Sequence, residues 1–243
     1  MFGLDPGVAL PVPAPTRAGA LRAALPAVAA ALAFRGACYV AMTAAAIFGE
    51  LRPAPTLPDV VIAHVPYVEA VAQGNYLLWL VLYVPVAVLL LWEAPRRFAR
   101  YAVTGGLVSL ARGATIALTG LGPPDPVHAG PGLAGHAPLQ ALLALASPWQ
   151  VFAHDAMAVY LTKDLFFSGH TATTFLLVLY VWPHRRLRAV ALAGHVLVVA
   201  SVFLAHLHYA IDVAGAYAVT FAIFALREGW PPRAPADDAA PDI

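Results

Sequence analysis

The chain has 243 residues, of which 61% are apolar and only 11% charged, and its mean hydropathy is +0.75. Soluble globular chains contain about 45–50% apolar and about 25% charged residues, so the composition excludes a water-soluble domain and a disordered chain. The 14 basic and 13 acidic residues leave a net charge of +1, which argues against a nucleic-acid partner. A single cysteine, Cys38, allows no intramolecular disulfide and argues against a cysteine-based metal site. The composition therefore indicates an integral membrane protein.

Six apolar segments follow one another along the chain. The length of each is close to the roughly 20 residues that a helix needs to cross the hydrocarbon core. The last three segments are short and separated by brief polar breaks, as expected for tightly turned antiparallel helices. We therefore predict an all-α polytopic membrane protein, a six-transmembrane-helix bundle that forms one domain over residues 27–228. The six predicted segments are approximately 27–49, 75–92, 101–121, 166–183, 187–206 and 210–226.

The two ends of the chain are expected to lie outside this domain. Residues 1–26 are rich in proline and lack the basic-then-apolar layout of a signal peptide, so we expect them to stay in the mature chain as a flexible segment. Residues 229–243 combine proline with acidic residues and are expected to form a flexible tail.

Basic residues are distributed unevenly around the six segments. If the chain crosses six times, the opposite side receives only Arg52 and Lys163, while Arg35 and Arg112 lie within segments. Loops on the cytoplasmic side of a membrane carry an excess of Lys and Arg, so we predict that both termini are cytoplasmic. The ten basic residues on the predicted cytoplasmic side are Arg17, Arg22, Arg96, Arg97, Arg100, Arg185, Arg186, Arg188, Arg227 and Arg233.

The outer face then carries two long loops, about 50–74 and 122–165, and a tight turn at about 207–209. Residues 138–152 are apolar enough for a short helix at the membrane interface. The second loop also contains three histidines whose spacing fits no standard metal site, so we predict no bound metal; they are His128, His136 and His154.

Two polar segments meet on that outer face. Ser168, Gly169 and His170 open the fourth predicted span, and His208 and Asp212 flank the turn between the fifth and the sixth. The topology thus brings three titratable groups to one side and one depth. Ionisable residues at membrane depth indicate function.

The spacing of these residues suggests their chemistry. His208 and Asp212 are four apart and share a helical face if the sixth helix begins near residue 207. A carboxylate that accepts from one ring nitrogen leaves the other nitrogen of His208 free as a nucleophile. The helix start at Ser168 and Gly169 offers backbone N–H groups to a phosphate, and His170 is placed to give and take protons. Together they predict phosphoryl transfer through a phospho-histidine, without a metal or another cofactor.

These residues resemble a known family. Ser168-Gly169-His170 and His208-x-x-x-Asp212 resemble two signatures of the type-2 phosphatidic acid phosphatase superfamily. The extended versions resemble, more narrowly, the two catalytic motifs of sphingomyelin synthases: Asp164-x-x-x-Ser168-Gly169-His170-Thr171 and His208-Tyr209-x-x-Asp212-Val213-x-x-x-Tyr217.

Two weaker matches extend the resemblance to about residues 55–220. Leu57-Pro58-Asp59 resembles the first-loop motif of the synthases, and Arg112 with Thr119 resembles their third-span motif, although Leu110 stands where a tyrosine is expected.

The sequence also departs from both patterns. Ser201 and Val202 stand where the phosphatases have Ser-Arg, and the missing arginine favours the synthase branch. Thr162 and Lys163 replace residues expected from animal synthases, which leaves the choice of head group open.

The resemblance implies a role for each site residue. His208 would attack the phosphorus of a glycerophospholipid while Asp212 orients it. His170 would protonate the departing diacylglycerol oxygen and then deprotonate the primary hydroxyl of the acceptor. The head group would be phosphocholine or phosphoethanolamine, and the acceptor ceramide or a similar lipid alcohol. Residues assigned to substrate binding are Ser168, Gly169, Asp164 and Arg112.

The site is expected to face the periplasm or exterior of a bacterial inner membrane, with both lipids entering from the bilayer. Two other functions stay open. A hydrolase, either phospholipase C-like or a lipid phosphatase, would result if water replaced the acceptor alcohol. A non-catalytic lipid-binding or transport protein is the third reading, and the complete set of three chemical groups argues against it.

Several polar residues have structural alternatives. Asp164 is either a helix cap or loop carboxylate, or a partner of His170 or of a cationic head group. Arg112 either binds the substrate phosphate or bridges helices. Arg35 is expected either to pair between helices or to have a functional role in the first span. His195 is expected to pair between helices, His206 to point away from His208, and Asp59 to serve either its loop or the site.

Overall fold

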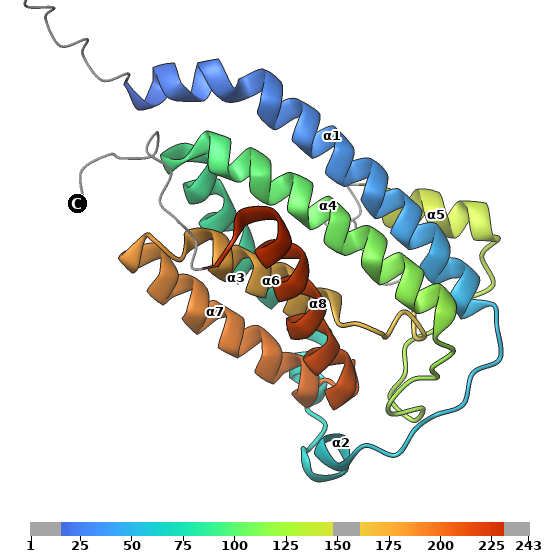
Figure 1. Ribbon diagram of the computed structural model, residues 1–243. Helices are drawn as coiled ribbons and strands as arrows, with labels where there is room; N and C mark the ends of the chain where they lie inside the picture. Colours follow the sequence, from blue (N-terminus) through green and yellow to red (C-terminus); the bar gives the residue numbers. More distant parts are fainter. Residues whose placement is uncertain (1–15, 148–160, 231–243) are drawn as a thin grey trace, which may run out of the picture.

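The computed structural model describes residues 16–147 and 161–230, and these residues form eight α-helices and no strand (Figure 1). The all-α prediction is confirmed for this part of the chain. The helices are α1 (Arg17–Glu50), α2 (Val60–His64), α3 (Glu69–Glu93), α4 (Pro95–Leu118), α5 (Pro138–Ala146), α6 (Gly169–Val181), α7 (Arg185–Leu204) and α8 (Ala210–Glu228).

Five of these helices, α1, α3, α4, α7 and α8, are long and apolar enough to cross a membrane. The prediction of six spans is therefore not confirmed. The fourth predicted segment, 166–183, holds only the 13 residues of α6, which measure about 20 Å at about 1.5 Å per residue, less than the about 30 Å of a hydrocarbon core.

The α6 helix is short because both of its ends are set by local chemistry. Ser168 caps its start, and Pro183 has no N–H group to continue the helical hydrogen bonds beyond Trp182. The helix packs against α3, α4, α7 and α8, and most of its residues are buried. It is the central helix of the bundle, and the longer helices surround it (Figure 1).

Two predicted boundaries can be compared with the described residues. The α1 helix begins at Arg17, ten residues before the predicted start of the domain, and Thr16 caps it by accepting from the N–H of Gly19 (3.2 Å). The α5 helix lies within the segment 138–152 and packs against α1. Residues 1–15, 148–160 and 231–243, and with them His154 and Arg233, lie outside the described residues.

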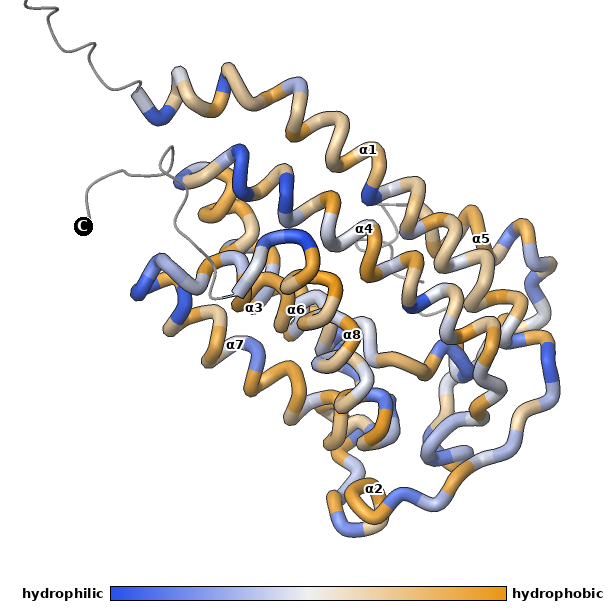
Figure 2. The backbone as a smooth tube through the Cα atoms, in the orientation of Figure 1, coloured by the Kyte–Doolittle hydropathy of each residue, from blue (hydrophilic) through white to orange (hydrophobic). Residues whose placement is uncertain are grey.

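The predicted arginine asymmetry corresponds to one end of the bundle. Figure 2 shows hydrophilic residues where α1, α4 and α7 start and where α8 ends, and these four helix ends lie at the same end of the bundle. Two ion pairs join helices there, Arg17 with Glu93 (2.9 Å) and Arg100 with Glu228 (3.2 Å). The cytoplasmic location of this end stays a prediction.

At the opposite end, the first long loop is tied to the start of α8. One carboxylate oxygen of Asp59 accepts from two backbone N–H groups of α2 (2.8 and 3.1 Å), and the other accepts from the N–H of Ala210 (2.6 Å). The Tyr209 hydroxyl accepts from the N–H of Leu57 (3.0 Å) and donates to the carbonyl of Gly122 (2.9 Å). Asp59 therefore serves both its own loop and the turn beside the predicted site.

Lys163 has a similar structural use. Its ammonium donates to the carbonyls of Glu50 (3.0 Å) and Arg52 (2.7 Å), where α1 ends. The Glu50 carboxylate in turn accepts from the backbone N–H groups of Thr162 (2.8 Å) and Lys163 (2.9 Å). These contacts anchor the segment that leads into α6.

Candidate functional site

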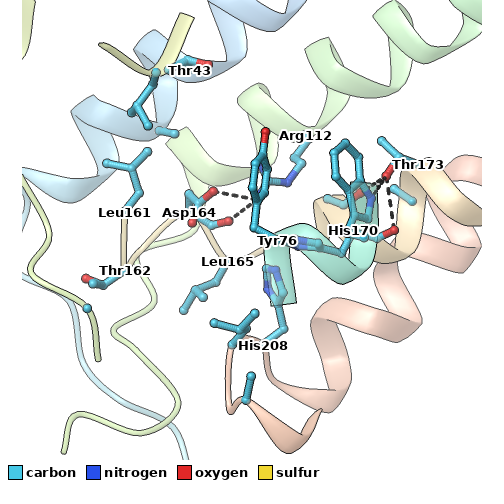
Figure 3. A pocket seen from close by; sticks show the side chains of 18 of the residues that line it. Thr43, Tyr76, Arg112, Leu161, Thr162, Asp164, Leu165, His170, Thr173 and His208 are labelled. Carbon is cyan, nitrogen blue, oxygen red and sulfur yellow. Dashed lines mark hydrogen bonds and ion pairs between the residues drawn. The ribbon is translucent and has the colours of Figure 1, made fainter. Parts of the chain in front are cut away.

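A cavity of about 770 Å³ opens at the loop end of the bundle, between α1, α3, α4, α6 and the turn before α8. Its walls include five of the seven predicted site residues: Gly169, His170, Arg112, Asp164 and His208. Figure 3 shows His170, His208, Arg112 and Asp164 around this cavity. The structure thus brings together two segments that are about 40 residues apart in the chain.

His208 and Asp212 form a buried pair. Nδ1 of His208 lies 3.4 Å from Oδ2 of Asp212, and both side chains are almost inaccessible. The expected reason for this contact is wrong, because α8 begins at Ala210 and His208 precedes it. The contact arises because Asp212, in the first turn, reaches back to accept from the N–H of Tyr209 (2.9 Å) and so places its carboxylate beside the turn.

Backbone contacts join the two motif segments directly. The N–H of Ser168 donates to the carbonyl of Asp212 (3.1 Å). The Ser168 side chain is fully buried and caps α6, because its Oγ accepts from the N–H (3.4 Å) and hydroxyl (3.1 Å) of Thr171. Gly169 and His170 therefore form the first turn of α6, and both line the cavity.

Sequence reasoning missed Asn75, which contacts His170. The Nδ2 atom of Asn75 lies 3.3 Å from Nε2 of His170, and the hydroxyl of Ser201 donates to Oδ1 of Asn75 (2.7 Å). Asn75 and Ser201 are both buried, and Ser201 also has the carbonyl of Val198 within donor range (2.8 Å). The sequence did contain a signal for this contact. Asn75 is a polar residue at the start of the second apolar segment, and polar groups within membrane spans need hydrogen-bonding partners.

Arg112 and Asp164 pair beside the start of α6, and both line the cavity. Nη2 of Arg112 donates to Oδ2 of Asp164 (2.9 Å) and also to the Asp164 carbonyl, while Nε donates to the carbonyl of Phe167 (2.7 Å). A side-chain carbon at position 169 would lie 3.3 Å from Cζ of Arg112, so Gly169 allows the guanidinium to approach the start of α6. Asp164 is thus the partner of Arg112 and does not cap the helix.

Arg35 and His195 form contacts between helices. Nη2 of Arg35 donates to the hydroxyl of Tyr83 (3.0 Å), and its guanidinium lies 4.9 Å from the centre of the Tyr101 ring. The two ring nitrogens of His195 lie 2.8 Å from hydroxyl oxygens on neighbouring helices, those of Thr174 and Tyr217. The expectation of interhelical pairing is confirmed for both residues.

None of the curated proteins matches the chain. A family model described as PAP2 superfamily C-terminal matches residues 163–228, a little over a quarter of the chain. This segment contains His170, His208 and Asp212, and the match supports the placement of the chain in the type-2 phosphatidic acid phosphatase superfamily.

Proposed function

We propose that this protein is a lipid phosphotransferase of the sphingomyelin synthase type. It would move phosphocholine or phosphoethanolamine from a glycerophospholipid to ceramide or a similar lipid alcohol, through a phospho-histidine. The observation that carries the proposal is the buried His208–Asp212 pair, whose histidine lines the same cavity as His170. The superfamily match supports phosphatase or phosphotransferase chemistry at this site.

In the first step, Nδ1–H of His208 donates to Asp212, which leaves the lone pair of Nε2 to attack phosphorus. The bond between phosphorus and the diacylglycerol oxygen breaks, and its electron pair stays with that oxygen. Protonated His170 supplies the proton that this oxygen needs, and diacylglycerol leaves. The head group is then held on Nε2 of His208.

In the second step, His170 takes the proton of the acceptor's primary hydroxyl. The hydroxyl oxygen attacks phosphorus, the phosphorus–nitrogen bond breaks, and its electron pair returns to His208. The site is regenerated because His170 is protonated again.

His170 must be protonated in one step and neutral in the other, and the Asn75 amide beside it can donate or accept a hydrogen bond. The Asn75 amide can present either an N–H or its oxygen to Nε2 of His170. The Ser201 hydroxyl, which has acceptors at both Asn75 and Val198, can donate to either as the amide turns. We assign Asn75 as a positioning residue that keeps the ring in place in both steps.

Arg112 is suited to stabilise the phosphate. Its Nη1 faces the thioether sulfur of Met42 (3.3 Å), a weak acceptor that a phosphate oxygen would replace. Asp164 fixes the guanidinium plane, and a fixed arginine near the start of α6 places positive charge where negative charge develops.

The second candidate function is a hydrolase. The superfamily match covers the segment that carries the three catalytic groups, and those groups would activate water in the same way as an alcohol. The two candidates differ only in the acceptor that resolves the phospho-histidine.

The test uses the full chain, purified in mixed micelles with phosphatidylcholine or phosphatidylethanolamine labelled in the head group, with and without ceramide. A labelled sphingophospholipid that forms only with ceramide supports the transferase. Head-group release that does not depend on ceramide identifies the hydrolase. The absence of any lipid turnover by folded protein would overturn both and favour a lipid-binding protein.

A quench experiment tests the intermediate separately. With labelled donor and no acceptor, the transferase is expected to retain label on the protein, and a phosphorus–nitrogen bond is stable to alkali and labile to acid. Label should be absent from His208→Ala and unchanged in His64→Ala, which alters an exposed histidine of α2. Label that persists in His208→Ala would contradict the assigned nucleophile.

A further inference from the structure

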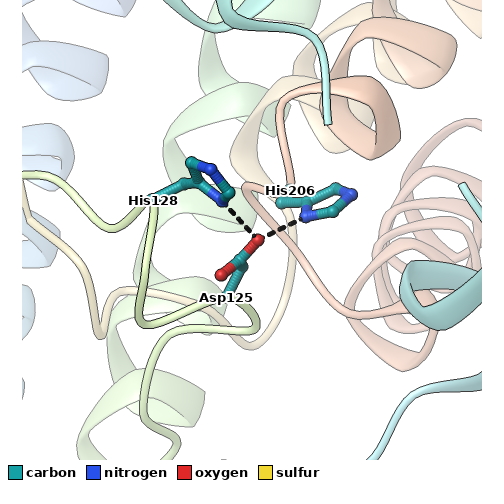
Figure 4. A group of neighbouring side chains, drawn as sticks. All are labelled: Asp125, His128 and His206. Carbon is teal, nitrogen blue, oxygen red and sulfur yellow. Dashed lines mark hydrogen bonds and ion pairs between the residues drawn. The ribbon is translucent and has the colours of Figure 1, made fainter. Parts of the chain in front are cut away.

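A second group of titratable side chains lies on the cavity wall outside the catalytic trio. Nδ1 of His128 and Nδ1 of His206 each lie 2.7 Å from Oδ2 of Asp125 (Figure 4). Asp125 and His128 belong to the loop after α4, and His206 belongs to the turn between α7 and α8. The cluster therefore joins two segments that are 81 residues apart, and its third member stands two residues before His208.

The second ring nitrogen of His206 shows how its protons are arranged. Nε2 lies 3.0 Å from the carbonyl oxygen of Val65, which can only accept, so Nε2 carries a proton. A neutral imidazole with its proton on Nε2 presents a lone pair on Nδ1. That lone pair faces a carboxylate oxygen, so a positive species is required between them: a second proton or a metal ion.

The surroundings match those of a metal-binding histidine. Such a histidine usually donates its other N–H to a carbonyl or carboxylate, which fixes the ring and its tautomer, and Val65 does this for His206. His128 is also held in place, because its ring stacks on Tyr67 with centroids 3.8 Å apart and planes 16° apart. His206 has a φ of +50°, an uncommon backbone conformation for a residue with a side chain, and it directs this ring toward Asp125.

The three potential ligand atoms lie within 4.8 Å of one another. A tetrahedral zinc ion with bonds of about 2.0–2.1 Å holds its ligand atoms about 3.3 Å apart. To reach this spacing, the Asp125 oxygen would move away from the two rings by less than about 1 Å, and the rings of His128 and His206 would move toward each other by a similar distance. His128 is 39% exposed in its side chain, so an ion and its water can enter from that side.

We propose that Asp125, His128 and His206 bind a divalent transition-metal ion of the zinc class, with water in the remaining coordination position. Two imidazoles and one carboxylate suit zinc better than magnesium or calcium, which prefer oxygen ligands. The ion would fasten the loop after α4 to the turn that carries His208. This site does not depend on the proposed function, because none of its ligands takes part in the phosphoryl transfer.

The proposed site departs from the prediction of no bound metal, which considered His128 only with His136 and His154. Those three share a loop, whereas the partners that the structure gives His128 come from its own turn and from a distant one. The expectation that His206 points away from His208 is compatible with its contacts to Asp125 and Val65.

The test is zinc binding by the full chain in detergent. Protein is stripped with a chelator, dialysed and titrated with Zn²⁺ in a calorimeter, and one ion per chain is expected. His128→Ala is the decisive variant, because this half-exposed residue can be removed without opening the core, and the affinity should fall at least about tenfold. His136→Ala, a change to another exposed histidine of the same loop, is the matched control and should bind as the unchanged protein does.

A second measurement identifies the ligands. Co²⁺ added to the stripped protein should give the visible absorption of a four-coordinate ion, and Asp125→Asn should weaken it. Zinc affinity that is equal in the unchanged protein and in His128→Ala would overturn the site, as would no binding by folded protein. Lipid turnover is expected to survive chelation, so the outcome for the metal site and the outcome for the proposed function can be distinguished.

Discussion

At the arginine-rich end of the bundle, oppositely charged side chains meet near the surface, whereas at the loop end histidine, aspartate and amide groups meet inside the protein. The Arg17 side chain is 43% exposed beside Glu93, while Asp212 is fully buried beside His208. Exposed pairs contribute little free energy, but a buried ionisable group costs desolvation energy and persists where its chemistry is used. Under the proposed function, the difference separates residues predicted to orient the chain from residues predicted to act on a ligand.

The largest expected effect is at His208. His208→Ala removes the proposed nucleophile and should reduce lipid turnover by at least about 1,000-fold, because the covalent intermediate would lose the nitrogen that holds the head group. The assay is the micelle reaction described above, with circular dichroism to show that helix content is retained. A variant that is folded and turns over lipid at a rate within tenfold of the unchanged protein would contradict the mechanism.

Asp212→Asn tests whether the buried charge, and not only its shape, is needed. The amide keeps the volume of the carboxylate and can keep an oxygen where Oδ2 accepts from both His208 and Tyr209, but it removes the negative charge that stabilises a positively charged His208 ring, so we expect a loss of about 100- to 10,000-fold in kcat. KM should change much less, since Asp212 lies behind His208 and does not touch the cavity. A larger effect on KM than on kcat would assign Asp212 to binding.

Asn75→Asp should give an intermediate effect with a distinctive pH profile. A carboxylate beside His170 stabilises the protonated ring, so the step in which His170 accepts a proton should require a higher pH. We expect kcat to fall about 10- to 100-fold at neutral pH and to recover partly in alkaline solution. A purely structural role for Asn75 predicts an equal loss at every pH.

The smallest effect is expected at the other end of the bundle. Arg17→Gln removes a surface ion pair and should lower the free energy of unfolding by less than about 1 kcal/mol, with no change in lipid turnover. Thermal unfolding in detergent and the micelle assay measure both quantities. A loss of turnover in this variant would remove the distinction between the two ends.

The sequence was sufficient for features that depend on local patterns. Apolar segment length predicted helices throughout the bundle, and the spacing of His170, His208 and Asp212 predicted one site, because antiparallel helices return these residues to the same end. The arginine distribution likewise predicted which helix ends lie together.

Features that depend on distant contacts were not predictable in this way. Asn75 meets His170 across 95 residues, and neither residue's neighbours in the chain indicate the other. The segment 166–183 is as apolar as a span, but the start of α6 is fixed by the Ser168 cap, so apolar length overstated the helix. The buried location of α6 depends on its neighbours, which hydropathy does not report.

The contact between Asp59 and Ala210 has a consequence for any exchange of parts between related proteins. Because a carboxylate from the first outer loop accepts from the first N–H of α8, that loop completes a helix that it does not precede in the chain. A chimera that replaced residues 50–68 with a loop lacking such an acceptor would leave α8 without this cap, directly beside the turn of His208. A chimera should therefore exchange this loop together with α7 and α8, so that the contact between Asp59 and Ala210 is kept.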